Sequence, residues 1–361
     1  MFSSQVYTLK KFIRKILLWI NLSAALLLIL SYLFVYVPPD RFWEGSVFGL
    51  AYPIFLWINI LFVIFWAIFK PRYLILSLFV IFIGWGHISK YVQIGNKSDN
   101  SGGIHIVSYN VRAFDEFGDN AAKTTADSII AFFNKKSPDI ICLQEVKLRS
   151  PQIFNLFELK QKYDFASHYQ YALTTDYGGI VTMTKYPIVN MGEIRFVNSG
   201  NMAIFTDVAI GPDTLRIFNL HLQSFRIEPV DYPVIESPRL TEPADRKKIR
   251  QMGGKFKRAV KMRAEQARIV SENIERSPYP VLVCGDFNDT PFSYTYHEVR
   301  GNLRDAFTES GNGFDHTYIG KLPSYRIDYI MHSEGFQAFD FKPEHIYFSD
   351  HLPVSCSLVK K

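Results

Sequence analysis

The sequence predicts an α/β (α+β) domain that follows an N-terminal membrane-spanning helical region. Two long apolar stretches without charge and all five tryptophans lie within residues 1–92. After residue 103, short runs rich in valine and isoleucine alternate with turn signals and with helix-like segments. Such runs are typical of buried strands, and their mixture with helices favours large sheets covered by helices.

The charge of the chain is concentrated in its first quarter. The formal net charge is +6, from 40 basic and 34 acidic side chains. Residues 1–92 hold eight of the basic and two of the acidic side chains, which leaves 32 of each sign for residues 93–361. The C-terminal part is therefore neutral, and the net charge does not indicate a nucleic-acid-binding domain.

Residues 1–92 are predicted to form a membrane anchor with about three transmembrane helices, at 16–37, 48–69 and 73–88. The first two stretches have 22 residues each and no charged side chain, which is enough to cross about 30 Å of hydrocarbon. The third has only 16 residues, and the flanking Arg72 and Lys90 would have to extend it toward the interfaces. A cleaved signal peptide is disfavoured because the first stretch is too long and a second one follows.

Loop charge predicts the orientation of this anchor. Four basic residues precede the first stretch, and Lys70 and Arg72 separate the second from the third, whereas the loop between the first two is near neutral. The positive-inside rule then places the N-terminus in the cytoplasm, in a multi-pass protein of the cell (inner) membrane. With three spans the C-terminal domain lies outside the cytoplasm. If the third stretch only lies on the membrane surface, the domain returns to the cytoplasm.

Residues 93–103 are predicted to be a flexible linker, because they include the polar, Gly/Ser-rich run Asn96–Gly103. Residues 104–361 would then form one domain. Within it, Ala121–Lys135 and Arg246–Arg276 have helix-like patterns. The expected strands are Ile104–Tyr109, Ile140–Leu143, Ile180–Met183, Ile204–Ala209, Leu215–Leu220, Val281–Cys284, Ile327–Met331 and Val354–Leu358.

Acids, amides and histidines gather at the ends of the expected strands, where packing alone would not require them. Asn219 and His221 are two residues apart and so point to one face of a strand, as do Asp286 and Asn288. Asp328 lies inside an apolar strand. The other polar residues at strand ends are Asn110, Glu145, Asp350 and His351.

These residue types suit metal-assisted attack on a phosphate ester. Carboxylate and amide oxygens are the ligands that Mg²⁺, or alternatively Mn²⁺, prefers, and histidines can donate to phosphate oxygens or move protons. The sequence has no cysteine–histidine cluster typical of structural zinc, no glycine-rich nucleotide loop and no Gly-x-Ser-x-Gly element. Water is therefore the expected nucleophile. The three cysteines lie in strand-like runs and are expected to be small buried apolar residues.

Six short motifs occur in order along the domain: Ser108-Tyr-Asn110, Leu143-Gln-Glu145, Asn219-Leu-His221, Gly285-Asp-Phe-Asn-Asp-Thr-Pro291, Arg326-Ile-Asp328 and Ser349-Asp-His351. Together they resemble the endonuclease/exonuclease/phosphatase superfamily, whose fold is that of deoxyribonuclease I. The resemblance covers about residues 104–359. It implies a four-layer sandwich of two mixed β-sheets flanked by helices, with the site at one end.

The resemblance also implies a role for each residue of the site. Glu145 would be the principal Mg²⁺ ligand, helped by Asn110 and Asp350. Asp286 would orient or deprotonate the attacking water, and Asp328 would orient His351. The implied catalytic residues are His221, Asp286, Asn288, Asp328 and His351, and the implied phosphate-binding residues are Asn219, Asn288 and His221.

The implied activity is that of a membrane-anchored, Mg²⁺-dependent phosphoesterase of the nuclease type. An alternative is a phosphodiesterase for phospholipid or sphingolipid head groups, or an inositol-phosphate phosphatase, because a lipid substrate would lie beside the enzyme. A third possibility is a catalytically silent binding domain. The expected partners are a phosphate-ester substrate, nucleic acid or lipid head group, and the lipid bilayer. The segment Arg246–Arg263, with nine basic residues and no acid, fits either a contact with a polyanion or a solvated helix face.

Overall fold

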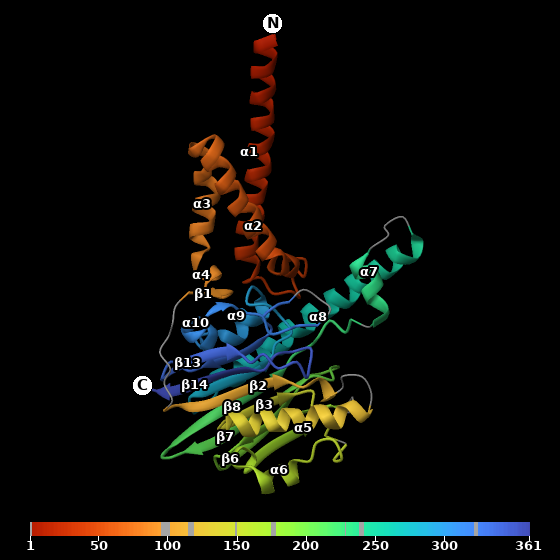
Figure 1. Cartoon of the computed structure of the whole chain (residues 1–361), viewed down its shortest axis with the longest axis vertical. Coiled ribbons are helices and arrows are strands. Elements are labelled where there is room, and N and C mark those ends of the chain that lie inside the picture. Colours follow the sequence, from red (N-terminus) through yellow and green to blue (C-terminus); the bar gives the residue numbers. More distant parts are fainter. Residues whose placement is uncertain are drawn as a thin grey trace. The chain divides into compact units, whose positions relative to one another are not determined.

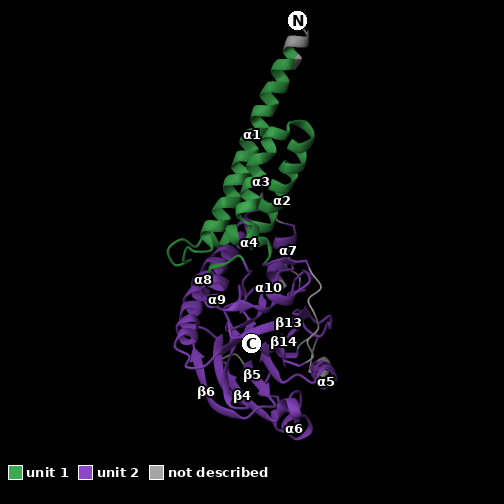
Figure 2. Ribbon diagram, turned by 90° about the vertical axis from the view of Figure 1, so that its left-hand side faces the viewer, with its two compact units in different colours: residues 1–89, 292–294 green, residues 90–291, 295–361 purple. Residues whose placement is uncertain are grey.

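The computed structural model describes residues 2–94, 102–114, 119–148, 150–174, 178–227, 229–237, 242–320 and 324–361. It divides into two compact units, residues 1–89 with 292–294 and residues 90–291 with 295–361 (Figure 2). Most of the predicted linker, residues 95–101, lies outside the described residues. Gln93, which the sequence assigns to the linker, instead belongs to the short strand β1 (Val92–Gln93), which pairs with β11 (Gly313–Phe314).

The first unit consists of apolar helices (Figure 1). Two of them, over Tyr7–Phe34 and Gly45–Phe69, are long and apolar enough to cross a membrane. The third predicted stretch contains a shorter apolar helix and is interrupted at Gly84. The elements are α1 (Phe2–Phe34), α2 (Gly45–Phe69), the 3₁₀ turn η1 (Pro71–Tyr73), α3 (Leu74–Ile83) and α4 (Trp85–Ile88).

The first unit buries polar side chains and exposes apolar ones. Asn21, Asn59 and Ser77 are fully buried. They join α1, α2 and α3, because the Asn21 amide donates to Ser77 Oγ at 2.6 Å and the Ser77 hydroxyl donates to Asn59 Oδ1 at 2.9 Å. Large apolar side chains face outward, for example Trp19, which is 69% exposed, and Phe82, which is 73% exposed. This pattern is expected of helices that pack through polar groups in an apolar solvent.

Helices α1 and α3 run in the same direction within this unit (Figure 1). Ser77, near the start of α3, binds Asn21 of α1. One turn later on α3, the Val80 carbonyl accepts a hydrogen bond from the Tyr32 hydroxyl at 3.3 Å, near the end of α1. The chain therefore leaves α3 at the end of the bundle where α1 also ends.

The second unit contains two six-stranded sheets. Sheet I has the strand order β13-β14-β2-β3-β5-β4, and sheet II has the order β10-β12-β9-β8-β7-β6. Each sheet has one parallel pair, β2–β3 in sheet I and β8–β9 in sheet II, among otherwise antiparallel neighbours. The strands are β2 (Ile104–Asn110), β3 (Ile140–Gln144), β4 (His168–Leu173), β5 (Gly179–Thr184), β6 (Ile188–Arg195), β7 (Met202–Ile210), β8 (Asp213–His221), β9 (Val281–Asp286), β10 (Arg304–Asp305), β12 (Asp328–His332), β13 (Phe336–Pro343) and β14 (Val354–Lys360).

The two sheets pack face to face, and helices cover their outer faces (Figure 1). Helices α5 (Asp119–Lys136) and α6 (Leu156–Lys162) pack on sheet I, and α8 (Pro243–Glu275) and α9 (Tyr294–Arg300) pack on sheet II. The three cysteines lie between the sheets, buried and free, as predicted. All eight predicted strands and both predicted helices are present. The predicted four-layer sandwich of two mixed sheets is therefore confirmed.

Candidate active site

The carboxyl ends of the two parallel strand pairs carry most of the polar residues predicted for the site. In sheet I, Asn110 of β2 lies opposite Gln144 of β3, so Glu145 follows at the same end. In sheet II, His221 of β8 lies opposite Asp286 of β9, and Asp328 of β12 lies on the other side of Asp286. Because parallel strands end at the same edge of a sheet, the topology gathers these side chains.

Left-handed backbone conformations occur where the strands end at the site. Glu145 has a φ of +55° and Asn288 a φ of +52°. Gly285 has a φ of +140°, and a Cβ atom there would lie 2.0 Å from the carbonyl oxygen of Leu220. Only glycine allows β8 and β9 to approach so closely just before Asp286. Strained non-glycine positions such as 145 and 288 are typical of functional sites.

Asp286 is buried at the centre of the site. Its Oδ1 accepts the backbone N–H of Asn288 at 2.7 Å, and its Oδ2 accepts the side-chain amides of Asn288 and Asn110, both at 3.0 Å. Burial raises the pKa of Asp286 to about 6, against the opposing charge of two nearby histidines. A carboxyl group with this pKa can exchange a proton near neutral pH.

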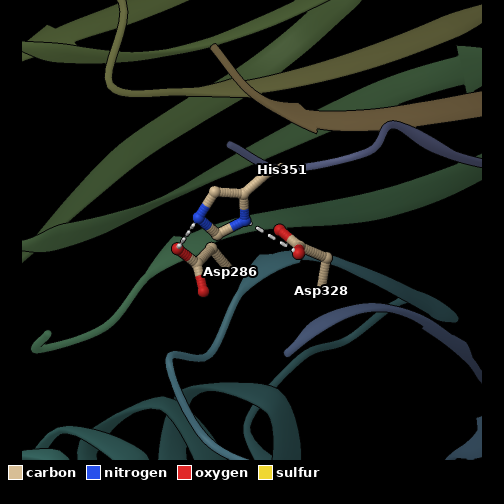
Figure 3. Close-up of side chains that lie close together, drawn as sticks. All are labelled: Asp286, Asp328 and His351. Atoms are coloured by element: carbon tan, nitrogen blue, oxygen red, sulfur yellow. Dashed lines mark hydrogen bonds and ion pairs between the residues drawn. The ribbon is translucent and has the colours of Figure 1, made fainter. Parts of the chain in front are cut away.

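His351 lies between two carboxylates (Figure 3). Its Nδ1 is 2.9 Å from Asp328 Oδ2, and its Nε2 is 3.9 Å from Asp286 Oδ2. Burial lowers the pKa of His351, but the two carboxylates outweigh burial and raise it to about 10. The three side chains bring ligand-type atoms within 4.8 Å of one another. The cluster is therefore a possible site for a metal ion, and without a metal the two carboxylates favour the protonated imidazole.

Glu145 and Asp350 are the accessible carboxylates of the site. Their side chains are 38% and 25% exposed, which suits a hydrated ion such as Mg²⁺ that keeps several of its waters. The Asn110 amide N–H donates to Glu145 Oε1 at 3.2 Å, and Asn110 Oδ1 accepts the backbone N–H of Arg112 at 3.0 Å. Asn110 thus orients Glu145 in this arrangement, and the carboxylates of Glu145 and Asp350 offer oxygens of the type that divalent ions prefer.

His221 faces Glu145 from sheet II. Its Nε2 lies 3.3 Å from Glu145 Oε1 and 3.9 Å from Asp286 Oδ2. This nitrogen is buried and makes no hydrogen bond with any residue that the structure describes. Its nearest acceptor is the Glu145 carboxylate, and a buried polar atom that makes no hydrogen bond is costly. Its position therefore suits a ligand group such as a phosphate oxygen.

The part of the chain that carries the site matches a known protein family. A model of the endonuclease/exonuclease/phosphatase family matches residues 107–351, which include every residue of the site. The chain belongs to the endonuclease/exonuclease/phosphatase family. Residues 14–91 match a second family, a domain of unknown function (DUF8431). A search of curated proteins finds no match to the chain.

Several solved structures are similar to this endonuclease/exonuclease/phosphatase protein. Humanized TDP2 of D. rerio is 17% identical with a TM-score of 0.52, and the match covers 72% of this chain and 100% of that one. A functionally unknown protein from Enterococcus faecalis V583 is 16% identical with a TM-score of 0.51, covering 71% and 100%. A family protein from Bacteroides thetaiotaomicron is 18% identical with a TM-score of 0.50, covering 73% and 100%. At these identities the likeness shows the fold.

Membership of the endonuclease/exonuclease/phosphatase family confirms the predicted enzyme class. The chain is a hydrolase of phosphate esters, and the family uses divalent metal ions. This result, together with the complete set of acids, amides and histidines, disfavours the silent binding domain. The structure brings together Asn110, Glu145, His221, Asp286, Asn288, Asp328, Asp350 and His351.

Asn219 does not reach the surface of this site. It is fully buried between the sheets. Its Oδ1 accepts the amide of Gln144 at 2.7 Å, and its Nδ2 donates to the carbonyl of Val181 at 2.8 Å. Both ends of the Asn219 amide are therefore used to join sheet II to sheet I. The pattern of strand ends does not single out Gln144, although it stands beside Glu145 in the second motif.

A cavity of about 260 Å³ opens beside Glu145 and His221. Two basic residues that the sequence patterns do not predict, Lys147 and Arg226, line this cavity. Lys147 follows Glu145 by two residues, which is the one signal that could have identified it. Arg226 lies beyond His221 and outside the six motifs, so its place depends on how the following loop folds.

Proposed function

We propose that this chain is a membrane-anchored, Mg²⁺-dependent phosphodiesterase of the nuclease type that uses water as its nucleophile. The observation that carries the proposal is the position of Asp286. Asn110 and Asn288 hold this buried carboxyl group between the imidazoles of His221 and His351. One proton acceptor between two imidazoles supplies a base for water and donors for the phosphate oxygens.

The proposed roles follow from these contacts. Asp286 orients the attacking water and accepts its proton. His351, which Asp328 keeps as a cation, directs its Nε2–H toward the reacting phosphate. His221 binds a phosphate oxygen through its buried Nε2. Asn288 holds Asp286 through its backbone N–H and its amide, and it can also contact the phosphate.

Glu145 and Asp350 are proposed to hold the divalent ion. Their accessible oxygens fit Mg²⁺, and Mn²⁺ prefers the same type of ligand. Asn110 fixes the Glu145 carboxylate next to His221. A bound divalent ion supplies Lewis-acid stabilisation of the negative charge that develops on the phosphate.

Helices α1, α2 and α3 are proposed to form the membrane anchor. Their buried Asn21, Asn59 and Ser77 and their exposed apolar surface favour a lipid environment. The parallel course of α1 and α3 supports three crossings, because the chain then leaves the bundle on the side where α1 ends. With the basic residues before α1 in the cytoplasm, the catalytic unit lies outside it.

A nucleic-acid strand is the first substrate class to test. A structure of D. rerio TDP2, 16% identical with a TM-score of 0.51, contains that protein in complex with a single-strand DNA product. A phospholipid or sphingolipid head group is the second candidate. It is favoured by the exposed apolar surface of the helical unit, which would keep the enzyme at a bilayer.

A substrate panel tests this proposal. The full-length protein would be placed in lipid nanodiscs and offered single-stranded DNA, single-stranded RNA, sphingomyelin and glycerophosphoinositol, each with Mg²⁺ or with chelator. We expect Mg²⁺-dependent cleavage of a nucleic acid that the Asp286→Asn variant lacks. Cleavage of a lipid head group alone would replace the nuclease assignment with the second candidate. Cleavage of none of the four would contradict the proposal.

A further inference from the structure

The cavity beside Glu145 and His221 differs in charge from the rest of the site. Its volume of about 260 Å³ is below the roughly 300–1,000 Å³ of pockets that enclose a whole drug-sized ligand. It therefore suits one part of a substrate whose reacting phosphate lies at His221. Lys147 and Arg226 line it, and Glu145 is the sole acid among the described residues of its lining. An anionic group would find two basic partners there.

Arg226 lies on a loop that is fixed to α8. Its φ is +50°, a conformation that residues other than glycine adopt infrequently. The Lys255 ammonium of α8 donates to the Arg226 carbonyl at 3.4 Å and pairs with Asp231 at 2.8 Å. A strained residue persists only where its surroundings determine its conformation. The contacts with Lys255 are part of such surroundings.

The preceding residues of the loop are held as firmly. The ring of Phe225 stacks on Phe256 of α8, with centroids 5.2 Å apart and planes inclined by 23°. The guanidinium carbon of Arg263 lies 4.4 Å from the centroid of Phe225. Arg263 is fully buried and donates to the Gln223 carbonyl at 2.8 Å. The packing of α8 therefore determines where Arg226 lies relative to His221.

We propose that Lys147 and Arg226 form a subsite for a second phosphate group of the substrate, adjacent to the phosphate that is hydrolysed. The inference rests on the proposed phosphodiesterase function and narrows its substrate class. Guanidinium and ammonium groups bind phosphate by charge-assisted hydrogen bonds, whereas a cationic choline head group would be repelled. The chemistry fits a nucleotide chain, which carries a phosphate on each successive residue, and a phosphorylated inositol.

Matched substrate pairs test the subsite. One set is a thymidine dinucleotide without a terminal phosphate, with a 5′-phosphate or with a 3′-phosphate. The other is glycerophosphoinositol with and without a ring phosphate. For the full-length protein with Mg²⁺, the second phosphate should raise kcat/KM by about tenfold or more in one set, and that set identifies the source of the phosphate. The measured quantity is the ratio of kcat/KM with the second phosphate to kcat/KM without it. Arg226→Gln and Lys147→Gln should each lower this ratio toward one.

Arg276→Gln is the matched control, because Arg276 is 77% exposed at the end of α8 and pairs only with nearby Glu272 among the contacts described. This variant should keep the wild-type ratio. If the wild-type protein hydrolyses the substrates with and without the second phosphate equally well, the subsite is overturned and the phosphodiesterase function still stands. A ratio that survives both Arg226→Gln and Lys147→Gln would overturn it as well. Hydrolysis of no substrate would contradict the proposed function and the subsite together.

Discussion

Burial separates the carboxylates of the site into two kinds. Asp286 and Asp328 are each 1% exposed and contact His351, whereas Glu145 and Asp350 have accessible side chains. Desolvation raises the pKa of the buried Asp286 to about 6, whereas an accessible carboxylate can exchange ligands with water. The same residue type can therefore handle protons at one position and hold a metal ion at another.

The Asp328→Asn substitution tests the role of the buried pair. An amide cannot neutralise the imidazolium, so the pKa of His351 should fall and the ring should lose its fixed orientation. We expect kcat to decrease by roughly 10²- to 10⁴-fold, the usual range for general acid–base groups, with little change in KM. Steady-state kinetics and an NMR titration of His351 measure both effects. An unchanged kcat with a shifted His351 pKa would show that the imidazolium is not needed.

The Glu145→Gln substitution tests the role of the accessible pair. It removes a negative charge but keeps the shape of the side chain, which is 38% exposed, so the melting temperature should stay the same. The Mg²⁺ concentration for half-maximal activity should rise by about tenfold or more. Loss of a residue that only supports a metal ligand already lowers metal affinity by about tenfold or more, and loss of the ligand itself should cost at least as much. Glu272→Gln, at a position 61% exposed on α8, is the control. Equal Mg²⁺ requirements for both variants would exclude Glu145 as a ligand.

Sequence motifs predict the site residues at strand ends and fail where tertiary packing decides. Asn219 shares a strand face with His221, as the two-residue period requires. It lies deeper between the sheets, however, and Gln144 occupies its amide. Arg226 belongs to no motif. Its position depends on contacts between its loop and α8, which the strand pattern does not predict. Strand period and motifs therefore predict most of the residues that the structure brings together, but not the lining of the cavity beside them.

Among the elements, the eight predicted strands lie inside the two large sheets, whereas the strands that the sequence did not predict in these sheets lie at their edges. Strands β4 and β13 are the edges of sheet I, and β6 and β10 are the edges of sheet II. The buried interior strands are nearly continuous apolar runs, for example β3. An edge strand such as β6 mixes polar and apolar residues because much of it faces solvent. Hydrophobic patterning therefore identifies the interior of each sheet and misses its borders.

The Glu309 carboxylate joins α10 (Ala306–Ser310) to β12 and β13. Its Oε2 accepts the backbone N–H of Ala338 at 3.0 Å and lies 3.0 Å from His332 Nε2, and its Oε1 accepts Arg304 at 2.9 Å. Burial alone would raise the pKa of Glu309. The hydrogen bonds outweigh burial and lower the pKa from 4.5 to about 2. Glu309 therefore stabilises the fold above about pH 4.5, and this contribution is lost as the pH falls toward 2.

Glu309→Gln should lower the free energy of unfolding by about 2 kcal/mol at pH 7, the scale of hydrogen bonds to a charged group. The difference from wild type should shrink as the pH falls from 4.5 toward 2. Urea unfolding followed by near-UV circular dichroism measures both quantities. Glu334→Gln removes another partner of Arg304 that is 82% exposed, and it should change stability by less than about 1 kcal/mol. A Glu309→Gln effect that is the same at both ends of this pH range would contradict the assignment.

For the whole molecule, we expect the C-terminus to lie outside the cytoplasm. The native cysteines are buried, so an introduced cysteine can be labelled selectively with a membrane-impermeant maleimide. Lys361→Cys, at the exposed C-terminus, should react in intact spheroplasts, because three crossings put it outside. Lys70→Cys, between α2 and α3, should react only after permeabilisation. Protection of both cysteines until permeabilisation would show that the chain crosses the membrane twice, and the reverse pattern would contradict the predicted orientation.

We propose that residues from both sheets form one divalent-metal phosphodiesterase site around Asp286. The most direct measurement is the hydrolysis of bis(p-nitrophenyl) phosphate by the full-length protein, with chelator and after Mg²⁺ is added back. We expect chelator to abolish turnover and Mg²⁺ to restore it. Asp286→Asn should lower turnover by roughly 10²- to 10⁴-fold in a protein that circular dichroism shows to be folded. Turnover that resists chelator, or that survives in Asp286→Asn, would contradict the account.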